Sequence, residues 1–315
     1  MLVDVSVVIV TWNTRELVRR CVRSVLERSG GVSLEATVVD NASTDGTCDT
    51  LCREFPDVRL IANETNVGFP SAANRGIVDA RGRYVLLLNS DTEATPGALS
   101  EMVRFMDAHR DVAALGPRLV DRDGALQPSC YSNMNAWKTF AVAYGLADVM
   151  PYAQLERLSP RNVLRRIVDF PDHERVLYPN WFRGACMLLR GDAVRDVDGL
   201  DERFFVYFEE IDLFDRLREA GWTIAYLPTA TFIHHGDVVI RMENPRLTLA
   251  FWESRRRLCD KRGRSFRTHR AALLVGTLMR LFNSLTVASF GSPSARQRFL
   301  TCTTILKWLL DDGEA

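Results

Sequence analysis

Short hydrophobic runs alternate with amphipathic stretches over roughly the first 110 residues of the chain. Val5–Thr11 is continuous and β-branched, which is typical of a buried strand. The next stretch places its apolar residues on one helical face and ends at Gly30–Gly31, which predicts a helix. The same alternation predicts strands ending at Asp40 and Leu88, a third short strand within "VRLIANETNVGF", and helices over Phe69–Ala80 and Gly97–His109. Strands that alternate with helices indicate an α/β fold with a mostly parallel central sheet flanked by helices.

Polar clusters follow four of these strands at the point where each strand ends. In parallel sheets, ligands bind outside the carboxyl ends of the strands. Four clusters at one edge are more than turn chemistry requires, so we expect a binding site there. The clusters are Thr11–Asn13, Asp40–Asp45, Asn66–Gly68 and Asn89–Asp91.

The alternation of strand-like and helix-like segments becomes less regular after about Asp121 and is regular again after Tyr178. We interpret the intervening stretch as a connecting region with short helices and a mobile loop. Beyond it, Trp181–Arg190 predicts a strand, and "FFVYFEEIDLFDRLREAGW" has apolar residues at helical spacing. The segment "TIAYLPTATFIHHGD" predicts a strand, a turn at Pro228 and a second strand.

The last seventy residues are basic and apolar. The segment "ESRRRLCDKRGRSFRTHR" has eight Lys or Arg against two acids. The apolar run Ala271–Met279 is shorter than the roughly 20 residues that span a bilayer, and Arg280 and Asn283 interrupt its continuation. Two interpretations stay open: helices that cap the main domain, or an amphipathic segment in a membrane surface whose basic run binds anionic headgroups.

Composition and charge argue against several classes of protein and favour one cellular compartment. The 315 residues have a formal net charge of zero, which argues against a protein whose whole surface binds nucleic acid. Seven scattered cysteines without a Cys-x-x-Cys pair disfavour a zinc cage or a disulfide framework and favour a reducing cytosol. The chain runs almost directly into its first strand without a leader-like pattern, so we expect a cytoplasmic protein.

Seven motifs follow one another between about residues 4 and 265: "VVIVTWN", "VVDNASTDGT", "NVGFPSAANRG", "LLLNSDT", "RGACMLLR", "GLDERFFVYFEEIDL" and "FIHHGD". In this order and at these spacings they resemble family-two inverting glycosyltransferases of the GT-A fold, and more narrowly the bacterial rhamnosyltransferase branch. The resemblance implies a Rossmann-like nucleotide-binding half joined to an acceptor-binding half.

The expected domain division follows from this resemblance. Residues 1–240 would form the GT-A catalytic domain, followed by a basic, amphipathic helical extension over 241–315. Within the domain we expect a nucleotide-sugar-binding half (1–120), a variable connecting region (121–178) and an acceptor and base half (179–240).

The resemblance implies that strand ends form the nucleoside pocket. Thr11, Asn13 and Asp40 match pocket-lining positions, and Asp40 could accept a hydrogen bond from a ring nitrogen of uracil or thymine. Asp45 lies in the same loop and is included in this set, although Asp45–Gly46 also has the pattern of a turn and a helix N-cap.

The segment "NVGFPSAANRG" is not a G-x-G-x-x-G dinucleotide loop. In the resembling family it closes over the donor, where Gly68 would allow close approach. Asn74 and Arg75 follow on the helix. Arg75 would contact the diphosphate or point to solvent.

Asn89, Ser90 and Asp91 match the family's Asp-x-Asp element. Mg²⁺ and Mn²⁺ take oxygen ligands from one or two carboxylates and from phosphates, which implies a metal at Asp91. Asn89 lacks the charge of the family's first position, and it would bond to the ribose or a metal-bound water instead. Of the adjacent histidines, His234 matches a second metal ligand, while a hydrogen-bonded structural role is the alternative.

Three acids begin the helix in "YFEEIDL". Carboxylates are favoured at helix N-termini by the dipole, but Glu209, Glu210 and Asp212 exceed what capping needs. The resemblance implies Glu210 as the general base, with Glu209 and Asp212 as alternatives; Asp212 could instead orient Arg216 or the metal site.

On the acceptor side the resemblance implies Trp181, Arg183 and Gly184. Trp181 would be a platform for a sugar ring or a core residue.

These residues and the resemblance together predict a metal-dependent inverting glycosyltransferase that uses a dTDP- or UDP-linked sugar with Mg²⁺ or Mn²⁺. The resemblance alone makes dTDP-rhamnose the best donor candidate. The predicted acceptor is a lipid-linked saccharide of envelope polysaccharide synthesis, which allows peripheral contact with the inner face of the membrane. The alternative acceptor is a soluble natural product or small molecule. A nucleotidyltransferase is disfavoured because "TWNTRELV" lacks a glycine-rich basic signature, and a non-catalytic homologue is disfavoured because Asp91 and Glu210 are present.

Overall fold

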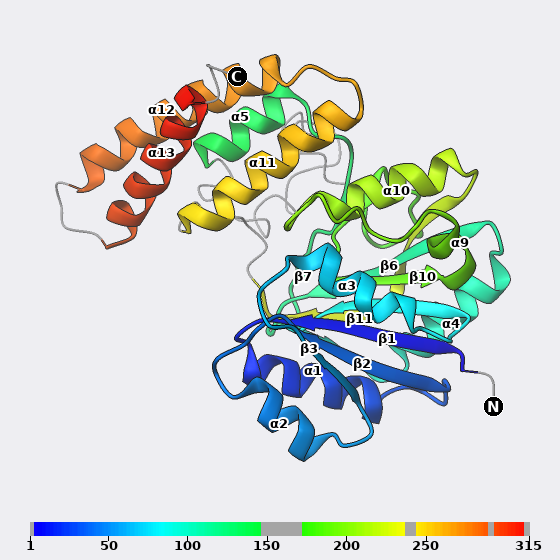
Figure 1. The fold of residues 1–315 in the computed structure, drawn as a ribbon. Helices are drawn as coiled ribbons and strands as arrows, with labels where there is room; N and C mark the ends of the chain where they lie inside the picture. Colours follow the sequence, from blue (N-terminus) through cyan, green and yellow to red (C-terminus); the bar gives the residue numbers. More distant parts are fainter. Residues whose placement is uncertain (1–2, 146–171, 237–243, 289–292, 312–315) are drawn as a thin grey trace. The chain divides into compact units, whose positions relative to one another are not determined.

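A computed structural model describes residues 3–145, 172–236, 244–288 and 293–311. The chain forms two compact units. Unit 1 comprises Met1–Ser132 and Pro171–Gly236, and unit 2 comprises Asn133–Phe170 and Asp237–Ala315 (Figure 1). Within the connecting region 121–178, where short helices and a mobile loop are expected, residues 146–171 lie outside the described residues.

Unit 1 is built on a nine-stranded sheet flanked by helices. Its order is β3-β2-β1-β4-β10-β6-β11-β5, and β7 pairs with β6. The first four strands are parallel, as predicted: β1 (Val5–Thr11), β2 (Leu34–Asp40), β3 (Arg59–Ala62) and β4 (Tyr84–Asn89). The helices between them are α1 (Arg15–Glu27), α2 (Thr47–Glu54) and α3 (Phe69–Val78).

The second half of the sheet is mixed, where the sequence predicts a mostly parallel one. β10 (Cys186–Arg190) lies antiparallel between β4 and β6 (Val112–Val120). β11 (Thr223–His234) runs parallel to β6, whereas β5 (Thr92–Ala94) and β7 (Leu126–Gln127) are antiparallel to their neighbours. A strand buried on both faces is a continuous apolar run in either direction, so its pattern does not encode its orientation.

Two predicted strand boundaries differ from the structure. The strand expected over Trp181–Arg190 is divided into β9 (Trp181–Phe182), which pairs with β8 (Cys130–Tyr131), and β10. The chain leaves the first pairing where Arg183 N donates to the Ser129 carbonyl. The turn expected at Pro228 is instead an irregularity in one strand, because β11 continues and only its register with β6 shifts between Leu227 and Thr231.

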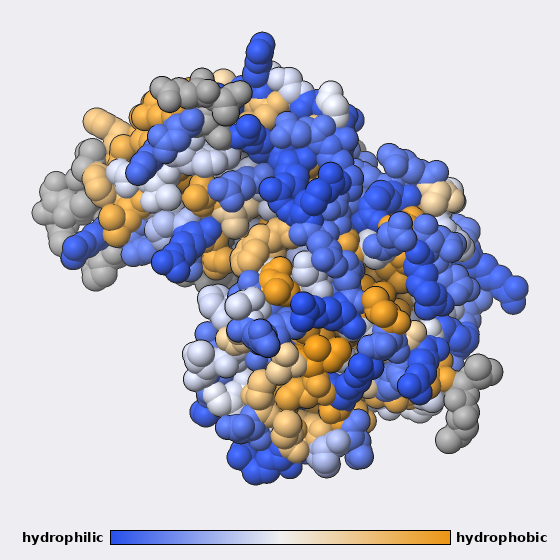
Figure 2. Space-filling view, in the orientation of Figure 1, coloured by the Kyte–Doolittle hydropathy of each residue, from blue (hydrophilic) through white to orange (hydrophobic). Residues whose placement is uncertain are grey.

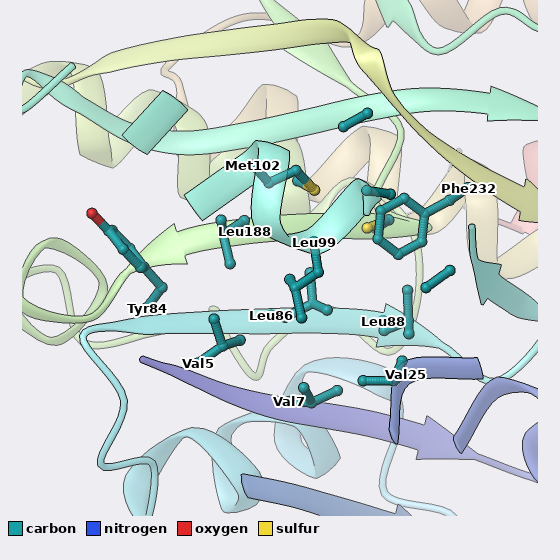
Figure 3. Close-up of a cluster of buried hydrophobic side chains, with 14 of the residues drawn as sticks. Val5, Val7, Val25, Tyr84, Leu86, Leu88, Leu99, Met102, Leu188 and Phe232 are labelled. Carbon is teal, nitrogen blue, oxygen red and sulfur yellow. The ribbon is translucent and has the colours of Figure 1, made fainter. Parts of the chain in front are cut away.

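Hydrophobic side chains cover both faces of the sheet. On one face, strand residues including Val5, Val7, Leu86 and Leu188 pack with residues of α1 and of α4 (Ala98–Ala108), as Figure 3 shows. On the other face, the alternating residues of β1, β4 and β10 pack with α3, α9 (Gly191–Asp196) and α10 (Glu209–Glu219). Burial of both faces explains the continuous apolar runs of the sequence.

Unit 2 is helical. It contains α5 (Ala136–Tyr144), α11 (Pro245–Lys261), α12 (Arg267–Ala288) and α13 (Pro293–Asp311). α5 and α12 approach closely at Gly276, where an added β carbon would meet Ala143 Cβ at 2.8 Å. A buried Arg255 donates to His269, whose other ring nitrogen bonds to Thr139, so three helices share one polar network. Among the described residues no helix is long and apolar enough to cross a membrane.

Candidate active site

The carboxyl ends of β1, β2 and β4 bring the predicted polar clusters to one edge of the sheet. Thr11 lies in register with Asp40, and Val10 with Asn89. Asn41 N then donates to the Thr11 carbonyl. The sheet register therefore places the first, second and fourth predicted clusters side by side.

Hydroxyl groups connect the first and fourth clusters. Thr11 Oγ1 lies 2.8 Å from Thr14 Oγ1, which donates to Ser90 Oγ at 2.9 Å. Asn13 lies in the left-handed region (φ 52°) and holds the second cluster, because its Oδ1 accepts from Thr44 N at 2.8 Å. The loop after β1 is thus fixed to both neighbouring loops.

The two aspartates after β2 have different environments. Asp40 is 1% exposed; its Oδ2 accepts from Ser43 N, while its Oδ1 is buried without a hydrogen-bond partner among the described residues. Asp45 accepts from Arg15 N and from both Thr47 N and Oγ1. These bonds lower the pKa of Asp45 against the effect of its burial. Asp45 therefore holds the loop, whereas Asp40 keeps an oxygen available for a ligand.

An asparagine network supports this edge, and the sequence interpretation missed it. Asn41 is 3% exposed, and its Nδ2 donates to Asn66 Oδ1 and to the Gly68 carbonyl. Its Oδ1 accepts from Asn63 Nδ2 and Val67 N. The available signal was the recurrence of asparagine after neighbouring strands. The network fixes the loop that precedes α3.

Three residues of "NVGFPSAANRG" contact protein groups in the structure. Gly68 has φ 85°, and an added β carbon would meet the Phe205 carbonyl at 2.6 Å, so the observed close approach is to the 199–205 loop. Asn74 holds the same loop: its Nδ2 donates to the Leu200 carbonyl and its Oδ1 accepts from Leu200 N. Arg75 Nη1 donates to Asn63 Oδ1. Here Asn74 and Arg75 organise the loops around the edge.

Asp91 and His234 come together at the end of β11. Asp91 Oδ1 lies 3.5 Å from His234 Nε2 and is buried without a hydrogen-bond partner among the described residues. Gly236 keeps the space between them open, because a β carbon there would lie 2.5 Å from Asp91 Oδ2 and 3.0 Å from His234 Nε2. Burial lowers the pKa of His234, which favours the neutral imidazole that binds metals.

These two side chains fit a divalent cation that also takes phosphate oxygens. Within the described ranges no group of three or more His, Cys, Asp or Glu could hold a metal alone. Mg²⁺ and Mn²⁺ sites of nucleotide enzymes commonly use one or two protein ligands plus phosphates, and a buried oxygen with unused lone pairs beside a neutral imidazole suits that role. His235 is occupied elsewhere, between Glu93 and Arg122.

The first turn of α10 presents two carboxylates, one on the buried Glu209 and one on the half-buried Glu210. Glu209 and Glu210 each have a buried Oε2 without a hydrogen-bond partner among the described residues. Burial raises the pKa of Glu210 to about 7. Burial, and then the charge of Glu210, raise the pKa of Glu209 well above its usual range. The preceding Tyr207 and Phe208 both have φ 68°, an uncommon conformation that fixes the direction in which the helix begins.

Glu210 lies beside two of the predicted acceptor residues. A β carbon at Gly184 would contact Glu210 Cβ at 3.6 Å, so Gly184 lies directly against the Glu210 side chain. The charge of Arg183 lowers the pKa of both Glu210 and His234, so Arg183 is within electrostatic range of both groups. Arg183 Nη2 also donates to the hydroxyl of Tyr131, whose ring stacks on Trp181 at 4.4 Å. The indole Nε1 of Trp181 donates to the Ser132 carbonyl.

Solved structures share the fold of the chain. The mannosyltransferase PcManGT from Pyrobaculum calidifontis, solved with GDP-Man and Mn²⁺, is 15% identical with a TM-score of 0.56, covering 96% of this chain and 85% of its own. GalNAc-T7, solved with UDP, GalNAc and Mn²⁺, is 15% identical with a TM-score of 0.53, covering 75% of this chain and 44% of its own. The fold is therefore of the GT-A type.

Sequence comparison finds a match to a family model. Residues 6–155 match Glycosyl transferase family 2. It is 32% identical over 212 residues to N-acetylglucosaminyl-diphospho-decaprenol L-rhamnosyltransferase of Mycobacterium tuberculosis, which covers 63% of this chain; the chain spans 65% of the length of that relative. It is also 39% identical over 107 residues to the succinoglycan biosynthesis protein ExoO of Rhizobium meliloti (strain 1021), covering 33% of this chain and 30% of the relative.

Proposed function

We propose that the protein transfers a sugar from a nucleoside diphosphate to an acceptor hydroxyl with inversion at the anomeric carbon. The observation that carries the proposal is the combination of two carboxylates of raised pKa at the start of α10, Glu209 and Glu210, with the Asp91–His234 corner. Asp40 and the hydroxyls of Thr11 and Ser90 line the nucleoside side of the same edge. A GT-A fold and the match to family 2 accommodate this chemistry.

Glu210 is the proposed general base. It takes the proton from the acceptor hydroxyl while that oxygen attacks the anomeric carbon and the bond to the diphosphate breaks. A carboxylate with a pKa of about 7 is matched to proton transfer near neutral pH. Direct displacement without a covalent enzyme intermediate inverts the configuration. Asp91 and His234 would hold Mg²⁺ or Mn²⁺, which would supply positive charge to the departing diphosphate.

Asp212 has a supporting role in this proposal. Its carboxylate is 2% exposed and pairs with Arg216 Nε at 2.8 Å. Arg216 in turn donates to the Val197 carbonyl, which ties α10 to the turn after α9. We therefore assign Asp212 to positioning α10.

Donor and acceptor follow from chemistry and from the relatives. Asp40, with a buried oxygen that lacks a partner among the described residues, suits the ring N–H of thymine or uracil. The mycobacterial relative is named as a rhamnosyltransferase acting on a decaprenol-linked N-acetylglucosamine. We propose dTDP-rhamnose as the donor and a lipid-linked saccharide as the acceptor; a soluble small molecule is the alternative. The stacked Tyr131 and Trp181 beside Arg183 would receive the acceptor sugar.

A membrane contact by unit 2 would accompany a lipid-linked acceptor. On α12 the polar residues Thr277, Arg280 and Ser284 are buried together with Leu273. Its exposed positions include the apolar Leu274, Val275, Leu278, Met279 and Phe282, alongside the polar Arg267, Thr268 and Asn283. Hydrophobic atoms lie at the surface over α12 and α13 in Figure 2. The described residues of unit 2 have fourteen Lys or Arg against three acids, so we propose that this face rests on an anionic lipid surface.

A donor screen tests the enzymatic proposal. Nucleoside diphosphate release is followed with dTDP- and UDP-sugars and a polyprenyl diphosphate-linked N-acetylglucosamine, with Mg²⁺, with Mn²⁺ or with EDTA. We expect acceptor-dependent release from dTDP-rhamnose that stops in EDTA. Full turnover in EDTA would contradict the proposed role of the metal. Nucleoside diphosphate release that does not depend on the acceptor would contradict the proposed sugar transfer.

A further inference from the structure

Gln127, the last residue of β7, is buried directly behind His234. It is 4% exposed, and His234 is 6% exposed. Two hydrogen bonds join them, both 2.8 Å long: Gln127 Nε2 donates to the backbone carbonyl of His234, and Gln127 Oε1 lies against His234 Nδ1. The side-chain amide of Gln127 therefore hydrogen-bonds to both the backbone and the ring of His234.

These two bonds determine which ring nitrogen of His234 carries the proton. A backbone carbonyl only accepts hydrogen bonds, so the amide nitrogen of Gln127 must face it. The amide oxygen is then left facing Nδ1 and can only accept, so Nδ1 must carry a hydrogen. In the neutral imidazole the lone pair consequently lies on Nε2. Nε2 is the atom 3.5 Å from Asp91 Oδ1.

We propose that Gln127 is a positioning residue that locks His234 in the tautomer whose Nε2 lone pair is presented to a divalent cation at Asp91. The inference rests on the proposed function, because it specifies how the metal corner, formed by Asp91 and His234, is prepared for a cation. Ligating histidines are generally oriented by a partner on the other ring nitrogen, and loss of such a partner weakens metal affinity by about 10–100-fold. β7 is short and antiparallel to β6, in register Leu119↔Gln127, so the fold holds this amide through the central sheet.

The first test observes the tautomer without any metal. Long-range ¹H–¹⁵N NMR spectra of the metal-free protein, assigned with His234→Ala, distinguish the two tautomers among the five histidines. We expect a protonated Nδ1 and an unprotonated Nε2 at His234. A protonated Nε2 in the neutral ring would overturn the proposal.

The second test measures Mn²⁺ affinity in the presence of dTDP, by the loss of the free Mn²⁺ signal in electron paramagnetic resonance. Gln127→Met removes the acceptor and should weaken Mn²⁺ binding by about 10–100-fold. Gln127→Glu retains an oxygen for Nδ1–H and should recover part of the loss. Gln297→Met on α13 is the matched control and should bind Mn²⁺ as the wild type does.

The variants separate this inference from the proposed metal corner. If His234→Ala loses Mn²⁺ affinity while Gln127→Met retains it, Gln127 has no positioning role and the metal corner stands. If His234→Ala also retains full affinity, the metal corner itself is wrong. Circular dichroism and thermal unfolding establish that each variant is folded; should Gln127→Met not fold, the NMR result on the wild type decides.

Discussion

The buried Asp212 and the half-buried Arg216 form an ion pair one turn into α10, with Asp212 Oδ2 2.8 Å from Arg216 Nε. The pair lies on the same helix as Glu209 and Glu210, but both of those carboxylates have an oxygen without a partner among the described residues. The three acids that look equivalent in sequence thus have two different environments. Asp212 is paired with a cation. Glu209 and Glu210 instead have raised pKa values, mainly because of burial.

Replacing Glu210 by Gln should abolish most of the transfer activity. Removing a general base typically lowers the rate by about 10²–10⁴-fold, while the amide keeps the shape of the side chain. Nucleoside diphosphate release gives the rate, and calorimetric titration with dTDP should show unchanged binding.

Asp212→Asn is the comparison for that variant. It leaves Arg216 unpaired by charge and should lower the free energy of unfolding by on the order of 3 kcal/mol, with a smaller loss of rate at temperatures where it is folded. A near-normal rate in Glu210→Gln would transfer the base role to Glu209 or Asp212.

The pH dependence of kcat/KM should show an acidic limb. A base must be ionised to accept a proton, and burial raises the pKa of Glu210 to about 7, so activity should rise with pH and level off above about pH 7. Neighbouring carboxylates titrate as a pair, so the apparent pKa of this limb belongs to Glu209 and Glu210 together. Arg183→Met should move it to higher pH, since Arg183 lowers the pKa of Glu210. Arg104→Met on the exposed side of α4 should leave it in place; a limb that stays near pH 4.5 in the wild type would contradict the assignment.

The same carboxylates should make stability depend on pH. Their pKa values are raised in the folded protein above the ordinary 4.5, so the folded state binds more protons than the unfolded state in that interval. The contribution is favourable below about pH 4.5 and is lost as the pH rises through 7. Denaturant unfolding at several pH values should show Glu210→Gln less sensitive than the wild type between pH 5 and 7.

Gly68→Ala should damage the site far more than Gly97→Ala. Both glycines precede a helix with positive φ, 85° and 79° respectively. At Gly97 nothing lies within 4 Å of an added β carbon, so the cost is that of placing an L-residue in the left-handed conformation, about 1–2 kcal/mol. At Gly68 the β carbon would lie 2.6 Å from the Phe205 carbonyl, and its ψ of 168° belongs to a region used almost only by glycine. We expect a cost of about 3 kcal/mol and a lower kcat/KM; equal losses in the two variants would contradict the contact.

Acidic substitutions on α12 should release the protein from anionic vesicles. Leu278→Glu combined with Phe282→Glu places charge where exposed apolar side chains would enter the lipid surface. Flotation with phosphatidylglycerol vesicles should fall several-fold, while Val78→Glu, at an 82% exposed position of α3, should have no effect. Equal flotation of all three proteins would reject the membrane contact.

Much of unit 1 could be predicted because local patterns encode it. Strand ends at Asp40 and Leu88, and the acidic start of α10, were found within one residue of the observed bounds. The two hydrogen bonds between Gln127 and His234 could not be predicted, because 107 residues separate these residues and no local pattern relates them. The same holds for the bonds between Asn74 and Leu200, because 126 residues separate these two residues. The donor-binding role of Asn74, which the resemblance implies, stays a prediction. The individual site roles remain predictions that the variants above address.

The place of β10 in the sheet has a consequence for how the protein is made. β4 and β6 are never neighbours; each pairs with β10, which emerges from the ribosome about seventy residues after β6. Until then both strands have open edges, and their pairing is non-local, which slows folding and exposes strands to aggregation. A fragment that stops at residue 155 would contain the matched family domain and Asp91 but would lack the strand that closes the middle of the sheet. The folding unit is therefore discontinuous in sequence, and its completion waits for residues 186–234.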